Sequence, residues 1–180
     1  MEIIRTQIEG LLILQPRSFS DDRGSFHESY NKELLKREGI LDDFVQDNQS
    51  VSRKGVLRGL HFQKKPHAQA KLVRVARGKV LDVAVDIRKN SSTYGKHVAL
   101  ELDAEGCTMF YIPAGFAHGF LTLEENTVFV YKCSAYYNKA SEETIAWNDP
   151  DLNISWKKTD PMISSKDKEG RLFRDLPEFF

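Results

Sequence analysis

The sequence predicts an all-β fold of the sandwich or barrel type. Short apolar runs follow one another at regular spacing through the middle of the chain, and clusters of turn-forming residues separate them. Helical periodicity is scarce, which argues against a mixed fold. The chain has 180 residues, 41% of them apolar, so it can bury a sizeable core, and we expect one domain spanning residues 1–180.

The clearest helix signal lies at residues 31–38. Asn31 can cap the N-terminus of this helix, and Gly39 can end it. A second, weaker helical stretch lies near the C-terminus. From Trp156 onward the chain is rich in charged residues, and we expect this tail to wrap the core and to end in an apolar anchor at residues 176–180.

The strongest strand signal covers residues 70–88. Large apolar side chains recur at every second position from Leu81 to Ile87, which is the period of a half-buried strand. Gly78 and Lys79 interrupt the pattern, so we predict two strands, 71–77 and 80–88, paired as a hairpin. Four more strands are expected at residues 97–102, 108–112, 118–123 and 127–135.

Charge and hydropathy exclude several classes of partner. Lys plus Arg and Asp plus Glu number 26 each, so no global field attracts nucleic acid or an anionic membrane. No apolar run approaches the roughly 18 residues that span a bilayer, and we expect a cytoplasmic protein. The cysteines, Cys107 and Cys133, form no C-x-x-C pair and are expected to be buried free thiols without a chemical role.

Two histidines on predicted strands are the first candidates for chemistry. His61 follows Arg58 and Gly59 on one short strand, and His118 follows the turn that contains Pro113. A single histidine on an apolar strand is more often a structural group than a base. Two of them, on strands of one sandwich, make a functional interpretation as reasonable as a structural one.

A metal site is the first alternative to consider. Metal cupins carry an H-x-H pair with an acid, followed by P-x-G-x-x-H, and the second half is intact here at residues 113–118. In the first half, Gln63 stands two residues after His61, and Lys64 and Lys65 stand where a carboxylate would be needed. The sequence therefore favours a site without a metal, and we expect no other cofactor.

Without a metal, the strands offer a set of groups suited to moving protons beside a polarised carbonyl. A histidine such as His61 or His118 can take a proton, and Lys71 can stabilise the enolate. Tyr131 can return a proton from the opposite face, and a carboxylate such as Asp82 can orient a histidine. Taken singly, the lysine is equally well explained as a solvated strand residue and the tyrosine as an ordinary strand aromatic.

Other side chains could hold a diphosphate and a base. Arg23, Arg58 and Lys166 are candidates for phosphate contacts, although a surface ion pair explains any single arginine as well. Tyr136 and Tyr137 together could offer a flat face on which a base stacks.

Seven motifs occur in order along nearly the whole chain, from about Ile8 to Asp167. They read DRG at 22–24, FVQDN at 44–48, VLRGLHFQ at 56–63, KLVR at 71–74, DVAVDIR at 82–88, IPAGFAHGF at 112–120 and WNDP at 147–150. Together they closely resemble the dTDP-4-dehydrorhamnose 3,5-epimerase family. Motifs of this length, in series, are far more specific than any one of them.

The resemblance implies a metal-free jelly roll of the cupin type. Its implied activity is epimerisation of dTDP-4-dehydro-6-deoxy-D-glucose at carbons 3 and 5 to dTDP-4-dehydro-L-rhamnose, in the biosynthesis of dTDP-rhamnose and cell-surface polysaccharide. It assigns His61 as the base, paired with Asp167, Lys71 as the group that stabilises the enolate, and Tyr131 as the proton donor. Asp82 is given a supporting role beside a histidine.

The resemblance also implies a nucleotide-sugar site and a homodimer with exchanged N-terminal strands, so that each pocket is built in part by the partner chain. Three alternatives stay open: an epimerase restricted to carbon 3 or carbon 5, a metal-dependent cupin enzyme, and a sugar-nucleotide binding module without turnover. Tyr131 favours the double epimerase. The residues that match substrate contacts of the family are Arg23, Phe26, Glu28, Gln46, Asn48, Arg58, His118, Tyr137, Glu142 and Lys166.

Overall fold

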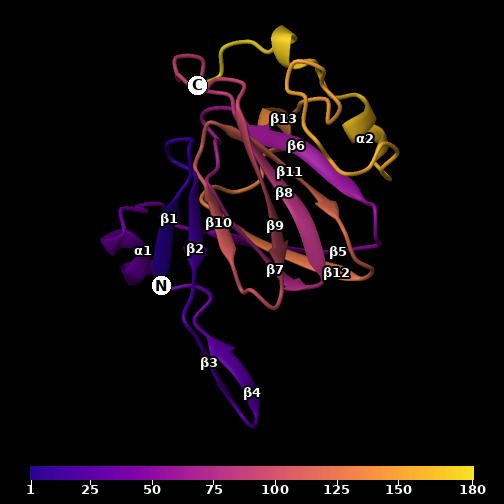
Figure 1. The fold of residues 1–180 in the computed structure, drawn as a ribbon. Coiled ribbons are helices and arrows are strands. Elements are labelled where there is room, and N and C mark those ends of the chain that lie inside the picture. Colours follow the sequence, from indigo (N-terminus) through magenta and orange to yellow (C-terminus); the bar gives the residue numbers. More distant parts are fainter.

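Two antiparallel β-sheets form the body of the protein (Figure 1). The computed structural model describes residues 1–180. One sheet has six strands in the order β1 (Glu2–Arg5), β2 (Leu12–Gln15), β10 (Met109–Ile112), β7 (Lys71–Arg77), β12 (Thr127–Cys133) and β5 (Gln46–Ser52). The other has five strands in the order β13 (Glu142–Thr144), β6 (Leu57–Gln63), β11 (Phe116–Thr122), β8 (Lys79–Asp86) and β9 (His97–Asp103). The predicted all-β sandwich is therefore confirmed.

The six strands predicted between residues 71 and 135 match β7 to β12, but the hairpin predicted between the first two is wrong. Strand β7 pairs with β10 and β12, whereas β8 pairs with β11 and β9 in the other sheet. Gly78, at φ 81°, carries the chain from one sheet to the other. A Cβ atom there would lie 2.5 Å from Thr127 Oγ1, so the crossing requires glycine.

Strand β8 is also more buried than its alternating pattern predicts, because both of its faces are covered. Val80 and Ala84 pack between the sheets, in a cluster with Val73, Phe110 and Phe129. The opposite face is covered by the C-terminal segment, which confirms that the tail wraps the core. The buried residues of that outer cluster include Leu81, Val83, Val85, Leu152, Trp156, Phe173 and Leu176, with Phe179 and Phe180 packed against it.

Helices are few and short. Helix α1 (Lys32–Arg37) begins at Asn31, whose side chain accepts a hydrogen bond from the backbone N–H of Leu34 at 3.1 Å, and Gly39 follows its end at φ 87°. Near the C-terminus lies helix α2 (Ser165–Lys168). Short 3₁₀ turns occur at Lys139–Ser141 and Phe173–Asp175. None of the helices is long and apolar enough to cross a membrane.

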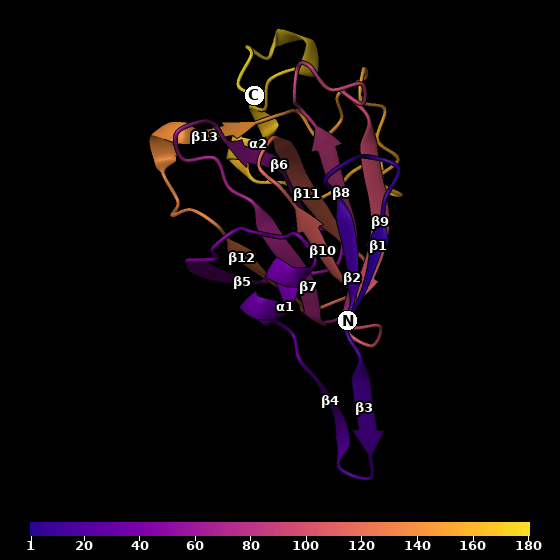
Figure 2. The same ribbon diagram turned by 90° about the vertical axis from the view of Figure 1, so that its left-hand side faces the viewer.

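Strands β3 (Ser18–Asp21) and β4 (Gly24–His27) form a separate hairpin that projects away from both sheets (Figures 1 and 2). Its side chains are almost all exposed, including Phe19 at 53% and Phe26 at 71% of their surface. Phe19 and Phe26 are paired across the two strands, so the hairpin presents an exposed apolar surface.

The cysteines differ from each other in their surroundings. Cys133 is a buried free thiol on β12, as predicted. Cys107 is also free but only half-buried, and it lies at φ 54° in the turn between β9 and β10. The prediction that Cys107 is buried in a strand was wrong because the apolar run that contains it does not become extended until Met109.

Candidate active site

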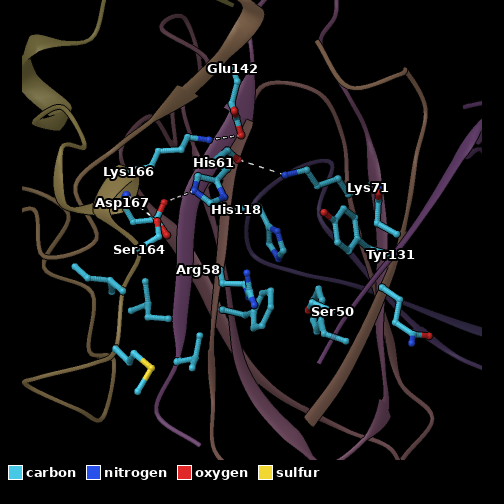
Figure 3. A pocket seen from close by; sticks show the side chains of 18 residues that line it. Ser50, Arg58, His61, Lys71, His118, Tyr131, Glu142, Ser164, Lys166 and Asp167 are labelled. Atoms are coloured by element: carbon cyan, nitrogen blue, oxygen red, sulfur yellow. Dashed lines mark hydrogen bonds and ion pairs between the residues drawn. The ribbon is translucent and has the colours of Figure 1, made fainter. Parts of the chain in front are cut away.

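A cavity of about 670 Å³ opens between the two sheets (Figure 3). Strands of both sheets and the segment that leads into α2 supply its walls. A smaller cavity of about 140 Å³ adjoins it and is lined by Gln46 and Tyr137 among others. The predicted site residues that line the larger cavity are Asn48, Arg58, His61, Lys71, His118, Tyr131, Glu142, Lys166 and Asp167.

His61 and Asp167 meet although 106 positions separate them in the sequence. His61 comes from β6 and Asp167 from α2, and His61 Nε2 lies 2.6 Å from Asp167 Oδ1. Ser164 caps α2 by accepting the backbone N–H of Asp167 at 3.1 Å. Burial alone would raise the pKa of Asp167, but hydrogen bonds from His61, Ser164 and the backbone of Gly59 hold this pKa below its usual range.

An ionised Asp167 can only accept, so the Nε2–H of His61 donates to it. The neutral ring then carries its basic lone pair on Nδ1. The side chain of His61 keeps 28% of its surface exposed, whereas that of Asp167 keeps 4%. The carboxylate therefore orients the imidazole from behind and leaves the ring accessible from the cavity.

Lys71 reaches into the cavity from β7 in the opposite sheet. It is 9% exposed, and its Nζ donates to the backbone oxygen of His61 at 3.3 Å. Burial lowers the pKa of Lys71, because the ammonium loses hydration that the protein replaces only in part. An anionic oxygen that enters the cavity would stabilise the ammonium form of Lys71.

His118 lies next to His61, since the two residues are paired between β11 and β6. His118 Nε2 is 3.0 Å from both carboxylate oxygens of Asp82, and Asp82 is fully buried. Burial lowers the pKa of His118 despite the neighbouring carboxylate. Asp82 thus lies beside a histidine, as predicted, and that histidine is His118.

Tyr131 stands on the wall opposite His61, on β12 of the six-stranded sheet (Figure 3). Its cross-strand neighbours are Asn48 on β5 and Val73 on β7. Burial raises the pKa of Tyr131, so its hydroxyl stays protonated at neutral pH. The cavity therefore has a histidine on one wall, a protonated phenol on the other, and a buried lysine between them.

Close packing of two glycines allows the strands to present the histidines side by side. Gly59 has φ 130°, and a Cβ atom there would lie 2.5 Å from the Cα of Gly119. The pairing of β6 with β11 shifts register between His118 and Phe120, next to this contact. Any larger residue at either glycine would push the two strands apart.

A chain of hydrogen bonds connects the polar residues at the mouth of the cavities. Glu142 accepts the hydroxyl of Tyr137 at 2.8 Å and pairs with Lys166. The backbone N–H of Tyr137 donates to Gln46 Oε1 at 2.9 Å, and Gln46 Nε2 donates to Asn48 at 2.9 Å. Five predicted binding residues are thus connected into one network.

Three predicted binding residues lie away from the cavity of their own chain. Arg23 and Phe26 belong to the projecting hairpin, and Glu28 follows it. The side chain of Arg23 is 91% exposed and pairs with Asp21 at 2.6 Å. Within one chain, the structure does not bring these residues together with the others.

The residues around the cavity do not offer the ligand set of a metal cupin. No group of three or more His, Cys, Asp or Glu side chains is placed to hold a metal ion. Gln63, at the position of the second cupin ligand, has its amide committed to the backbone: it donates to His67 at 2.7 Å and accepts from Asn138 at 2.6 Å.

Sequence reasoning missed several residues of the cavity lining, among them Ser50 and Ser164. Both have a signal in the sequence. Ser50 continues the two-residue alternation of Gln46 and Asn48 along β5, and Ser164 stands three residues before Asp167, the spacing of an N-cap and the backbone N–H that it accepts.

Comparison with known proteins identifies the family. The family model described as dTDP-4-dehydrorhamnose 3,5-epimerase matches residues 5–175. The chain is 48% identical over 180 residues to the dTDP-4-dehydrorhamnose 3,5-epimerase of Shigella flexneri, covering 99% of each chain.

Solved structures agree with this match. The dTDP-4-dehydrorhamnose 3,5-epimerase of Elizabethkingia anophelis superimposes with a TM-score of 0.92 at 48% identity, covering 97% of each chain. The dTDP-6-deoxy-D-glucose-3,5-epimerase of Legionella pneumophila, solved in complex with dTDP-4-keto-L-rhamnose, gives 0.94 at 46% identity, covering 98% of this chain and 94% of that one. These similarities confirm the predicted cupin-type jelly roll, and the chain belongs to the dTDP-4-dehydrorhamnose 3,5-epimerase family.

Proposed function

We propose that the protein converts dTDP-4-dehydro-6-deoxy-D-glucose into dTDP-4-dehydro-L-rhamnose by inverting carbons 3 and 5. The observation that carries this proposal is the opposition of His61, oriented by Asp167, to the protonated Tyr131 across one cavity, with Lys71 between them. The Legionella relative, bound to the corresponding keto-rhamnose, supports the choice of sugar.

In the proposed mechanism, Nδ1 of His61 takes the proton from the carbon next to the C4 ketone. The electron pair of the broken C–H bond moves onto the ketone oxygen, and the resulting enolate is stabilised by the ammonium of Lys71. Tyr131 then delivers its hydroxyl proton to the opposite face of the carbon, which inverts the centre. A positioned base contributes about 10² to 10⁴ in rate, and stabilisation of the enolate oxygen must supply much of the rest.

Inversion at the second carbon repeats the same steps after His61 has lost its proton and Tyr131 has regained one. Both carbons flank one ketone, so a single enolate-binding group serves both. Asp82 and His118 lie beside this position, and we assign His118 to substrate binding with Asp82 holding its orientation.

For the nucleotide, we assign Arg58 and Lys166 to the diphosphate and the ring of Tyr137 to thymine. Gln46, Asn48 and Glu142 share the hydrogen-bond network with Tyr137 and are assigned to the polar groups of the same ligand. The cavity of about 670 Å³ is within the usual range for ligand sites.

We further propose a homodimer in which the N-terminal strands are exchanged. Arg23, Phe26 and Glu28 would then complete the cavity of the partner chain. The exposure of Phe19 and Phe26 on the projecting hairpin supports this arrangement, because contact with a partner would remove their apolar surface from water.

Proton NMR of dTDP-4-dehydro-6-deoxy-D-glucose incubated with the protein in heavy water tests the proposed reaction. We expect deuterium at carbons 3 and 5, and no effect of a chelator. Label at one carbon alone would identify an enzyme restricted to carbon 3 or carbon 5. Absence of label would contradict the proposal, and loss of activity with chelator would instead favour a metal-dependent cupin.

A further inference from the structure

Ser50 carries the one buried side-chain nitrogen or oxygen atom in the chain that has no hydrogen-bond partner. Ser50 is one of the residues that line the 670 Å³ cavity, and Figure 3 shows it among the cavity side chains. Nearly all buried polar groups in proteins are hydrogen-bonded, so an exception inside a cavity requires an explanation.

The neighbours of Ser50 explain why the protein itself leaves the hydroxyl unpaired. Ser50 is directly opposite Phe129 on β12, and a phenylalanine ring has no nitrogen or oxygen atom to offer. Strand β5 is at the edge of its sheet, so no second strand supplies another neighbour. Asn48, two positions away on the same face, donates to Cys133 and accepts from Gln46.

Arg58 adds an unneutralised positive charge to the same cavity. Its guanidinium donates from Nε and Nη2 to the hydroxyl of Ser52, at 3.3 and 3.2 Å, and forms no ion pair with a carboxylate. Ser52 lies two positions after Ser50 on β5, so the two side chains are on the same face of the strand. A hydroxyl without an acceptor and a cation without an anion therefore share one cavity.

We propose that the Ser50 hydroxyl donates a hydrogen bond to a phosphoryl oxygen of the substrate's diphosphate, beside Arg58. This inference rests on the proposed function, which supplies the nucleotide sugar. A phosphoryl oxygen is a strong hydrogen-bond acceptor and carries negative charge. It would therefore accept the hydrogen bond of Ser50 and neutralise the charge of Arg58. In the free protein the unpaired hydroxyl costs stability, and the bound substrate removes that cost.

Replacement of Ser50 by alanine tests the assignment through two readouts: dTDP should bind more weakly, while the free protein should lose no stability. Ser50→Ala should raise the Kd for dTDP roughly tenfold, since hydrogen bonds to charged groups are the stronger ones, and should leave the weaker binding of thymidine unchanged. The Tm of the free protein should stay the same or rise, because the variant removes a buried group without a partner. Calorimetry measures dTDP binding, and competition against dTDP measures thymidine binding.

Ser91→Ala is a matched control. The hydroxyl of Ser91 donates to Asp86 at 2.6 Å and lies outside both cavities. This variant should lower the Tm and leave the Kd for dTDP unchanged, the reverse of the result for Ser50.

Three outcomes would overturn the inference. An unchanged Kd for dTDP would show that the hydroxyl does not meet the diphosphate. An equal loss of thymidine binding would show that Ser50 contacts the nucleoside or shapes the pocket. Failure of the unaltered protein to bind dTDP would overturn the proposed function and this inference together, whereas the first two outcomes leave the proposed function intact.

Discussion

At the scale of single residues, the site depends on His61 being both oriented and accessible. Asp167 holds Nε2 at 2.6 Å from one side, and the ring stays open to the cavity on the other. No buried apolar cluster includes His61, so its role can be separated from packing more cleanly than that of a core residue.

Replacement of His61 by alanine should lower kcat at least about 10²-fold, because the base that removes the proton is lost. The circular dichroism spectrum and the affinity for dTDP should change little. His67→Ala is the control, since it removes another half-buried histidine, one that bonds Ser141 outside the cavity. Turnover of the His61 variant at the rate of the unaltered enzyme would remove the central assignment.

Tyr131→Phe should separate the two halves of the reaction. The variant keeps the ring and the base but lacks the hydroxyl proton that is delivered to the new face. NMR in heavy water should detect deuterium entering next to the ketone while the configuration at that carbon is retained. Inversion at the normal rate would show that another group donates the proton.

At the scale of elements, the end of β8 is fixed by a buried carboxylate. Asp86 is fully buried and accepts from Arg88 at 2.7 and 2.9 Å and from Ser91 and Thr93 at 2.6 Å. Burial would raise the pKa of Asp86, but these hydrogen bonds lower it from 3.8 to about 2. The strand end and the loop that follows it therefore depend on an ionised Asp86.

The lowered pKa predicts a specific pH dependence of stability. Because Asp86 titrates lower in the folded than in the unfolded chain, its contribution of roughly 2 kcal/mol is present above the unfolded pKa and is lost as pH falls from about 4 toward 2. Urea unfolding from pH 7 to pH 2 measures it. Asp86→Asn should be less stable at pH 7, and the difference should shrink below about pH 4; a difference independent of pH would contradict the role.

At the scale of the whole molecule, one chain holds only part of the predicted site. Nine predicted residues line its larger cavity, while Arg23, Phe26 and Glu28 lie on or beside the projecting hairpin. In the proposed homodimer, a second copy would supply the hairpin that completes this site, and closed two-fold symmetry would give two equivalent sites.

Mixing two inactive variants tests this arrangement. In a dimer of His61→Ala with Arg23→Ala, one cavity carries both defects and the other carries neither. Random pairing after co-expression should therefore restore about a quarter of the activity of the unaltered enzyme, given two equivalent sites per dimer. Light scattering measures the mass of the particle. Activity no greater than the mean of the two variants would show that Arg23 acts within its own chain.

Local features of the sequence determined the strands, the capped helix and the candidate chemistry. Side-chain alternation from Leu81 to Ile87 predicted the strand observed as β8, the break at Gly78 marked the end of β7, and Asn31 and Gly39 marked the ends of α1. These signals depend only on neighbouring residues. The seven motifs indicated the family, and the resemblance to that family supplied the list of site residues.

Only the tertiary structure decided which segments meet. Alternation shows that a strand has two faces but not which sheet it joins, so β7 and β8 were wrongly paired, and the tail that covers the outer face of β8 was needed to explain its burial. The family resemblance implied that His61 pairs with Asp167, but the contact itself and the unpaired hydroxyl of Ser50 depend on residues distant in sequence. Such contacts arise from packing of the whole chain, and no local pattern encodes them.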